Sequence, residues 1–175
     1  CRCKLEGKME HFVSQDGLDM DGISGKTIQL LYDQGWLTRF GDFFRLKENA
    51  EEMKKLPGMG KTAVENLLTT VEKSRTVDAA HLLDALSIPF VGGDTSRKIS
   101  EQYDGDMEKI MEEAFREPER LEEIPGIGPT DSQSIKTWCN NADHMEKLYD
   151  LLGFLTIQKP AAKGNKLSGK TFVVT

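Results

Sequence analysis

The chain has 175 residues, of which 38% are hydrophobic and 30% are charged, and its net charge at pH 7 is −6. This composition is typical of an ordinary globular protein, and no apolar run approaches the roughly 20 residues that a membrane-spanning helix requires. Three cysteines, an odd number, argue against a disulfide framework, so we expect a cytoplasmic protein. The negative charge disfavours binding to nucleic acid or membranes through bulk electrostatics, and any contact with DNA must be local.

Helical patterns dominate between Lys8 and Gly153, where apolar residues recur at spacings of three and four. In chain order, the apolar faces are marked by Ile28, Leu31 and Tyr32; by Ala63, Leu67, Leu68 and Val71; by Leu82, Leu83 and Leu86; by Ile110, Met111 and Ala114; and by Met145, Leu148 and Leu152. Alternating patterns typical of strands are nearly absent. The sequence therefore predicts an all-α domain.

Four similar clusters of glycine and proline interrupt the helical stretches: DGISGK, PGMGKT, PFVGGD and PGIGPT. Their central triplets begin at Gly22, Gly58, Phe90 and Gly126, which are separated by 36, 32 and 36 residues. Near-constant spacing of this kind is the signature of an internal repeat. We expect four tandem units of helix, tight hairpin and helix, arranged as two pairs.

In the second and fourth clusters, two glycines flank one apolar residue. The first glycine can adopt positive φ and end the incoming helix, while the apolar residue enters the core. The second glycine, Gly60 or Gly128, begins the outgoing helix. There the free backbone N–H groups and the helix dipole favour a phosphate, which can approach closely because no Cβ is present. Such a site would bind a nucleic-acid backbone without reading bases.

The candidate DNA-binding residues come from all four clusters. Two lysines add local charge and the threonines can donate hydroxyl hydrogen bonds. The first and third clusters depart from the pattern, since Ser24 replaces the second glycine and Phe90 replaces the first. The candidates are Gly22, Ser24, Gly25, Lys26, Gly58, Gly60, Lys61, Thr62, Gly92, Gly93, Thr95, Gly126, Gly128 and Thr130.

The C-terminal stretch differs in charge from the rest of the chain. Residues 151–175 hold four of the 23 basic side chains and none of the 29 acidic ones, so the first 150 residues carry a net charge of −10. The segment TIQKPAAKGNK lacks apolar periodicity and is typical of a linker, and TFVVT at the end is typical of a strand. Because one strand cannot fold alone, we expect a piece of a longer protein.

Four stretches carry a resemblance to a known family: EHFVSQDGLDMDGI, LPGMGKTAVENLL, DALSIPFVGGDTSRKI and LEEIPGIGPTDSQSI. Together they resemble the four helix-hairpin-helix repeats of bacterial NAD-dependent DNA ligases, and LSGKTFVVT resembles the first strand of the BRCT domain that follows them there. The resemblance implies the end of a zinc module at residues 1–7, a helix-hairpin-helix domain at 8–153, a basic linker at 154–166 and a truncated BRCT domain at 167–175.

The resemblance also implies a function. In that family a separate catalytic half uses NAD and Mg to seal nicks during DNA replication and repair, while the helix-hairpin-helix domain grips the duplex. The implied partners are nicked duplex DNA, in the bacterial nucleoid, and the catalytic half of the same parent chain. This chain lacks a Lys-x-Asp-Gly nucleotidyl-transfer motif, so we expect it to be inactive alone and to hold no cofactor.

The family's zinc module has four cysteines in two spaced pairs, whereas only Cys1 and Cys3 occur here. They are candidate remnants of the zinc ligands, but two thiolates cannot complete a tetrahedral structural site. We expect His11 to be a packed or capping residue and Cys139 to be a buried apolar side chain. Gln15 stands where the family commonly has arginine, which removes one phosphate contact.

Two alternative functions remain open from the sequence. Degenerate helix-hairpin-helix pairs also serve protein docking or dimerisation, and the acidic net charge favours that interpretation. Base-excision glycosylases use an L-P-G-x-G hairpin with a catalytic aspartate about twenty residues later, a distance at which Asp78 stands from Gly58. The simpler prediction is that Asp78 caps a helix beginning at Ala79.

Overall fold

A computed structural model describes residues 1–159. Most of the predicted basic linker and the predicted BRCT strand at 167–175 lie outside the described residues. In chain order, the elements are α1 (Arg2–Val13), α2 (Gly25–Asp33), the 3₁₀ helix η1 (Phe40–Asn49), α3 (Ala50–Met53), α4 (Lys61–Lys73), β1 (Thr76–Asp78), α5 (Ala79–Ala85), α6 (Gly93–Gln102), α7 (Met107–Arg116), the 3₁₀ helix η2 (Pro118–Glu123), α8 (Pro129–Cys139), α9 (Ala142–Leu152) and β2 (Thr156–Gln158).

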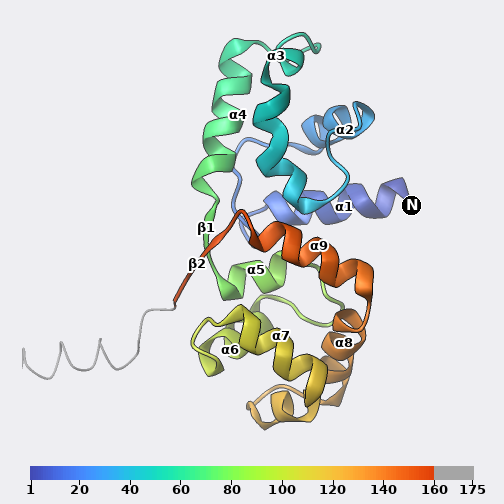
Figure 1. The fold of residues 1–175 in the computed structure, drawn as a ribbon, viewed down its shortest axis with the longest axis vertical. Coiled ribbons are helices and arrows are strands. Elements are labelled where there is room, and N and C mark those ends of the chain that lie inside the picture. The colour runs from blue at the N-terminus through green and yellow to red at the C-terminus, as the bar shows by residue number, and fades with distance from the viewer. Residues whose placement is uncertain (160–175) are drawn as a thin grey trace, which may run out of the picture.

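The helices form two groups along the long axis of the molecule. Helices α1 to α4 lie toward one end and α6, α7 and α8 toward the other, with α5 and α9 between them (Figure 1). Helix α9 packs on both η1 and α8, and α1 packs on α5, so these contacts join the two groups. No helix among residues 1–159 is long and apolar enough to cross a membrane.

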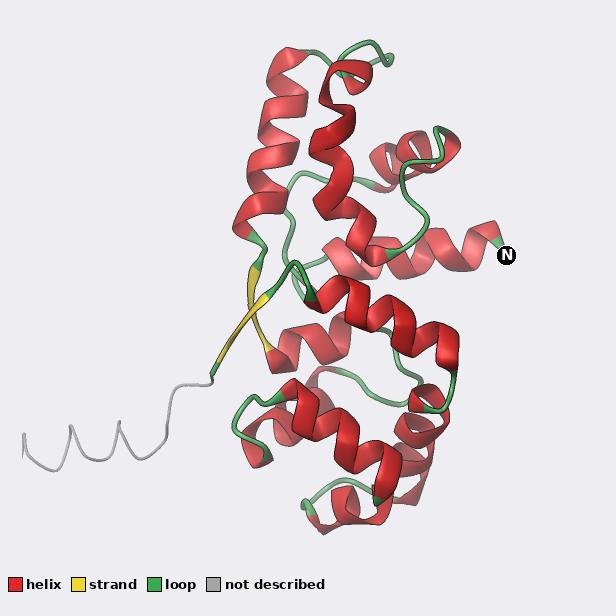
Figure 2. Cartoon of the chain, viewed as in Figure 1, coloured by secondary structure: helices red, strands yellow, loops and turns green. Residues whose placement is uncertain are grey.

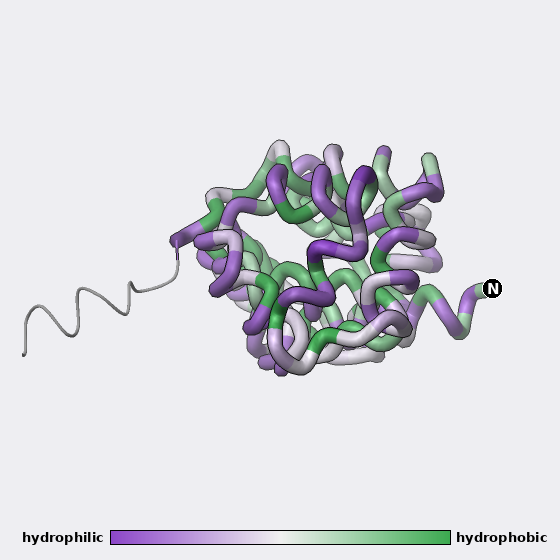
Figure 3. The backbone as a smooth tube through the Cα atoms, turned by 90° about the horizontal axis from the view of Figure 1, so that it is seen from below, coloured by the Kyte–Doolittle hydropathy of each residue, from purple (hydrophilic) through white to green (hydrophobic). Residues whose placement is uncertain are grey.

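Capping residues and buried apolar faces explain where the helices begin and what they cover. The side chains of Ser24, Asp78, Asp106 and Asn141 each accept a hydrogen bond from a backbone N–H in the first turn of the following helix. Hydrophobic and hydrophilic positions are interspersed along the coils of the backbone (Figure 3). In α4 the buried positions are Val64, Leu67 and Val71, and the predicted Ala63 is exposed.

The predicted all-α class is confirmed, with one addition. Strands β1 and β2 pair in parallel, with Val77 opposite Ile157, and form a short two-stranded sheet between the helices (Figure 2). The prediction that the linker begins at residue 154 is therefore wrong for residues 156–158. Three residues are too few to show an alternating pattern, and this strand is defined by its distant partner rather than by its own sequence.

The segment before the second predicted hairpin is the 3₁₀ helix η1 followed by the short α3, and the segment before the fourth is the 3₁₀ helix η2, whereas ordinary helices were expected. In η1 the reason lies in an aromatic cluster. Phe40 and Phe43, three residues apart, lie on one face of a helix with three residues per turn. Their rings stack on Phe12 of α1 at centroid distances of 4.3 and 5.5 Å. Phe43 and Phe44 are buried, so these aromatic residues belong to the core.

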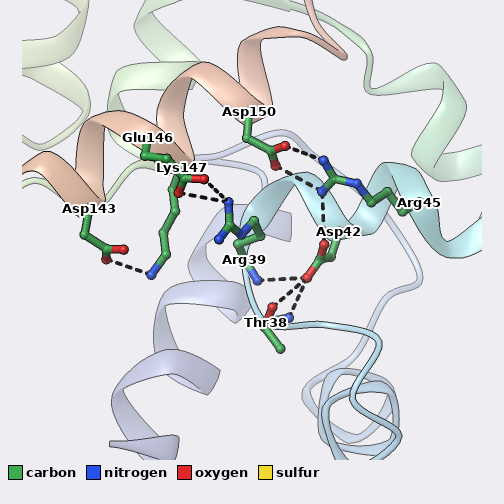
Figure 4. A network of polar contacts seen from close by, with 8 residues as sticks. All are labelled: Thr38, Arg39, Asp42, Arg45, Asp143, Glu146, Lys147 and Asp150. Atoms are coloured by element: carbon green, nitrogen blue, oxygen red, sulfur yellow. Dashed lines mark hydrogen bonds and ion pairs between the residues drawn. The ribbon is translucent and has the colours of Figure 1, made fainter.

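A polar network joins η1 to α9 (Figure 4). Arg45 Nη1 donates to Asp42 Oδ1 and to Asp150 Oδ2, each at 3.0 Å. Arg39 Nη1 lies 2.9 Å from Glu146 Oε1 one turn earlier on α9. Hydrogen bonds from Arg45 hold the pKa of Asp150 below its usual range. These contacts fix α9 across the junction of the two helix groups.

Candidate nucleic-acid interface

The four predicted hairpins share one backbone turn. We call residues 20–24, 56–60, 88–92 and 124–128 hairpins 1 to 4. In each, the backbone N–H of the fourth residue donates to the carbonyl of the first: Ile23 to Met20, Met59 to Leu56, Val91 to Ile88 and Ile127 to Ile124, at 3.0 to 3.3 Å. The residue before the donor has positive φ: 90° at Gly22, 78° at Gly58, 66° at Phe90 and 93° at Gly126. These are the properties of a type II turn.

The last two residues of each hairpin also have equivalent places. The apolar residue is buried in all four copies: Ile23, Met59, Val91 and Ile127. The next residue has extended backbone and is the N-cap of the outgoing helix: Ser24, Gly60, Gly92 and Gly128. The predicted backbone geometry is thus confirmed, including at the two hairpins whose sequences depart from the pattern.

Hairpin 2 is the most open of the four. No side chain caps α4, and no acidic residue lies in its first turn. A Cβ built on Gly58 or Gly60 would meet no atom within 4 Å. Lys61 and Thr62 are exposed at the start of the helix. The first backbone N–H groups of α4 are therefore accessible, with a cation next to them.

Hairpin 1 resembles hairpin 2 in charge but is more crowded. Ser24 Oγ accepts a hydrogen bond from the N–H of Thr27 at 3.2 Å, and Lys26 is exposed in an α2 first turn that holds no acid. A Cβ on Gly25 would lie 3.0 Å from the carboxyl carbon of Glu10. A side chain at position 25 would therefore require the flexible carboxylate of Glu10 on α1 to shift by a few tenths of an ångström.

Hairpin 3 carries an acid beside its glycines. Asp94, in the first turn of α6, binds Lys98 at 2.8 Å and Arg97 at 2.6 Å. Hydrogen bonds from Lys98 and then Arg97 lower the pKa of Asp94. Both cations near hairpin 3 are therefore already paired with a carboxylate, although the candidates Gly92 and Gly93 are exposed and Thr95 is half-buried.

Hairpin 4 is capped by its own chain. The N–H of Gly128 donates to Asp131 Oδ2 at 3.1 Å, which satisfies one of the amides that the sequence offered to phosphate. Pro129 follows and has no N–H. Thr130 is exposed, and Lys98 from α6 lies directly over Gly126. An acid three residues after an N-cap is a capping-box signal, so the sequence contained this information.

Hairpins 3 and 4 are held together by side chains. Ser134 Oγ of α8 donates to the carbonyl oxygen of Pro89 in hairpin 3. Lys98 of α6 reaches in the opposite direction to hairpin 4. Each outgoing helix thus contacts the hairpin of the other repeat, which is the reciprocal arrangement expected of a pair.

Among residues 1–159, the cysteines do not gather with other potential ligands. Cys1 and Cys3 are exposed at the start of α1, which runs without a break across the predicted boundary between residues 7 and 8. Among residues 1–159, no group of three or more potential ligands could hold a metal ion. Cys1 and Cys3 alone supply at most two of the four ligands of a structural zinc site, and their assignment as remnants of such a site stays a prediction. Cys139 is buried as predicted, and burial raises the pKa of its thiol to about 11.

Asp78 has the capping role that the sequence favoured. Its Oδ1 accepts the N–H of His81 at 2.8 Å at the start of α5. The side chain lines a cleft of about 890 Å³ whose other acids include Asp16, Asp84 and Glu101. His11 Nε2 lies 2.8 Å from the carbonyl oxygen of Asp84, and this contact with α5 is consistent with the packing role expected of His11. This arrangement gives the glycosylase alternative no support.

Comparison with known families supports the repeat structure. Residues 15–73 match a SAM-like helix-hairpin-helix tandem, and residues 81–148 match a helix-hairpin-helix motif. The chain therefore contains two helix-hairpin-helix regions in tandem. The two matches divide this helix-hairpin-helix chain between hairpins 2 and 3, as expected for two pairs.

The helix-hairpin-helix chain is also similar over its whole length to bacterial proteins named DNA ligase. It is 33% identical to the DNA ligase of Coxiella burnetii (strain RSA 493 / Nine Mile phase I), 31% to that of Lachnoclostridium phytofermentans and 32% to that of Acholeplasma laidlawii over 94% of the chain. It spans about a quarter of the length of these relatives, 25 to 27%. The resemblance to the helix-hairpin-helix region of a ligase is confirmed.

Proposed function

We propose that this chain binds duplex DNA without sequence preference, through backbone amides at its hairpins, as the DNA-gripping part of a DNA ligase. The observation that carries the proposal is the turn repeated in all four hairpins, which presents the N-terminus of an outgoing helix each time. Helix-hairpin-helix repeats and relatives named DNA ligase support the same function.

The mode of binding follows from the charge of the chain. With a net charge of −6, attraction over the whole surface is unfavourable, and amides aimed at phosphates need few cations. At hairpin 2, the exposed Lys61 adds one positive charge to the partial charge of the helix N-terminus. We expect a shallow salt dependence, equivalent to the release of about two to four counterions.

The ligase context extends the proposal to the parent protein. We infer a bacterial NAD-dependent ligase whose catalytic half, outside this chain, seals nicked duplex DNA with NAD and Mg in replication and repair. No residue of this chain is assigned to NAD, Mg or zinc. The chain alone should not join nicked DNA, because it lacks the Lys-x-Asp-Gly motif.

The test is a titration of the protein into a labelled nicked duplex at two salt concentrations, with the double variant Gly60→Val/Gly128→Val alongside. Neither glycine has an atom within 4 Å of a built Cβ, so valine should leave the fold intact while it obstructs a phosphate. Binding that is lost in the variant, with unchanged circular dichroism, supports the hairpin mode. Equal binding by both proteins, or a salt slope near ten counterions, contradicts it.

A protein-docking function is favoured by one surface. A groove of about 490 Å³ on α7, α8 and α9 is lined by Met111, Phe115, Met145 and Tyr149, and by none of the hairpin residues. Phe115 and Tyr149 are 53% and 63% exposed. Sedimentation of the protein without DNA distinguishes this function, since an oligomer that Tyr149→Ser dissociates would make the groove a dimer interface.

A further inference from the structure

Phe90 is the most exposed large hydrophobic residue in the described part of the chain. Its exposed fraction is 70%, above those of Phe115 and Tyr149. It stands at the apex of hairpin 3, where its φ of 66° lies in the left-handed region. A bulky residue rarely adopts this conformation, and the other three hairpins have glycine at the same place.

Packing within the protein does not account for this residue. Val91, and not Phe90, supplies the buried side chain of hairpin 3. The ring of Phe90 stacks on none of the aromatic or cationic side chains within residues 1–159. Glycine would complete the same turn without strain. A strained, mostly exposed aromatic residue without a stacking partner in the described part of the chain points to a contact outside the chain.

The repeat fixes the direction in which the ring is presented. Phe90 is equivalent to Gly22, Gly58 and Gly126, each of which lies two residues before the N-cap of an outgoing helix. It therefore stands on the same side of its repeat as the amides that we propose approach DNA. A hydrogen bond from Ser134 Oγ of α8 to the carbonyl oxygen of Pro89 holds the turn in place.

The chemistry of hairpin 3 favours an apolar contact over a phosphate contact. The carboxylate of Asp94 lies in the first turn of α6 and repels an approaching anion, while Arg97 and Lys98 are paired with it. Proteins that bind the minor groove place apolar side chains, phenylalanine among them, against sugars and base edges or between base steps. Phe90 is an apolar side chain of this kind on a rigid turn.

We propose that Phe90 is an apolar DNA contact, whose ring packs into the minor groove of the duplex that the hairpins hold. This inference rests on the proposed function. Hairpin 3 then contributes a contact that does not depend on charge, whereas hairpin 2 contributes one that does. The ring would add affinity and would fix the position of hairpin 3 along the groove.

The test compares Phe90→Gly and Phe90→Tyr with the wild-type chain, by titration into a labelled nicked duplex at two salt concentrations. Glycine removes the ring and the strain together, so the thermal midpoint should be equal or higher. We expect Phe90→Gly to weaken binding about five- to tenfold, by the same factor at both salt concentrations, because an apolar contact releases no counterions. Phe90→Tyr should bind within about twofold of the wild type because it keeps the ring.

Phe115→Ala is the matched control, since Phe115 is also exposed but lies on α7 and in no hairpin. It should leave DNA binding unchanged. If Gly60→Val weakens binding and Phe90→Gly does not, the proposed function stands and the role of Phe90 is overturned. If Phe90→Gly lowers affinity only at low salt, the ring is not an apolar contact. If the wild-type chain binds no duplex, the proposed function and this inference both fail.

Discussion

Hairpins 1 and 2 have the same backbone turn as hairpins 3 and 4 but opposite charge beside it. In the first two, the outgoing helix carries Lys26 or Lys61 in its first turn and no acid. In the last two, the first turn carries Asp94 or Asp131. The same turn can therefore present amides to a phosphate beside a lysine in the N-terminal half of the molecule, but beside an aspartate in the C-terminal half.

The difference shows that a hairpin motif defines geometry and not affinity. At hairpin 4, the Asp131 carboxylate accepts the hydrogen bond of the Gly128 N–H, which is then not free for a phosphate. At hairpin 2, no side chain competes for the amides of α4. We therefore expect the N-terminal pair to make the main phosphate contacts, and the C-terminal pair to position the duplex.

The largest difference in DNA affinity is expected between the single variants Gly60→Val and Gly128→Val. Gly60→Val should weaken binding to nicked duplex about tenfold, as expected for loss of one charge-assisted hydrogen bond, while Gly128→Val should weaken it less than threefold. Fluorescence anisotropy titrations of both variants measure the ratio. Equal losses would remove the proposed asymmetry between hairpins 2 and 4. Unfolding by either variant, seen in circular dichroism, would assign that glycine to structure instead.

Lys61→Ala should weaken binding about threefold at moderate salt and lower the salt slope by about one, since one cation no longer meets a phosphate. Lys73→Ala is the matched control, because Lys73 is exposed at the opposite end of the same helix. Titrations at four salt concentrations give both slopes. Identical slopes for the two variants would show that hairpin 2 does not face the duplex.

Asp131→Ala should strengthen binding about twofold, because the amide of Gly128 becomes free and a negative charge leaves the first turn of α8. The same change should cost about 0.5–1 kcal/mol of unfolding free energy through loss of the cap. Asp143→Ala, an exposed acid in the first turn of α9, removes the same charge away from the hairpins. If both variants gain equally, the gain comes from net charge alone.

Asp150→Asn tests the contribution of the ion pair between Asp150 of α9 and Arg45 of η1, which joins the two helix groups. At neutral pH it should lower the unfolding free energy by about 1–2 kcal/mol, since the partly buried contact with Arg45 loses its negative charge and one of its two acceptor oxygens. Because Arg45 depresses the folded pKa of Asp150, this stability exists above the unfolded pKa and disappears as pH falls through the folded value. Thermal unfolding of both proteins from pH 7 to pH 2.5 should show the gap closing, with DNA affinity at pH 7 reduced less than twofold. A gap that persists at low pH would contradict the assigned ion pair.

Much of the fold could be predicted because its signals are local. Glycine at Gly22, Gly58 and Gly126 marks positive φ directly, and the spacing of the clusters indicates the repeat. The 3₁₀ helices and the β1–β2 pairing were missed, because both depend on distant partners such as Phe12 for η1 and Arg75, whose carbonyl accepts the N–H of Thr156 at 2.7 Å. No window of neighbouring residues contains those contacts.

The sequence predicted the backbone geometry of the four hairpins, but not which hairpin amides are already bonded to an acidic side chain. Which amides have competing acceptors depends on side-chain directions, as at Asp131, where a capping-box signal was present and unused. The strain at Phe90 could also have been inferred by placing the four clusters side by side, since a bulky residue then occupies a position that otherwise requires glycine. Arg97 and Lys98 follow Asp94 at the three- and four-residue spacings of helical ion pairs, so their pairing could also have been predicted from the sequence.

The parallel pairing of β1 with β2 has a topological consequence. Parallel neighbours require a crossover connection, and here residues 79–155, with hairpins 3 and 4 and α9, form that connection. The C-terminal pair thus lies within a segment whose two ends are adjacent, as the hydrogen bond from Thr156 N–H to the carbonyl oxygen of Arg75 shows. The chain therefore enters and leaves this half of the molecule at adjacent points, and the contacts of α9 with η1 and of α1 with α5 hold the half against the rest.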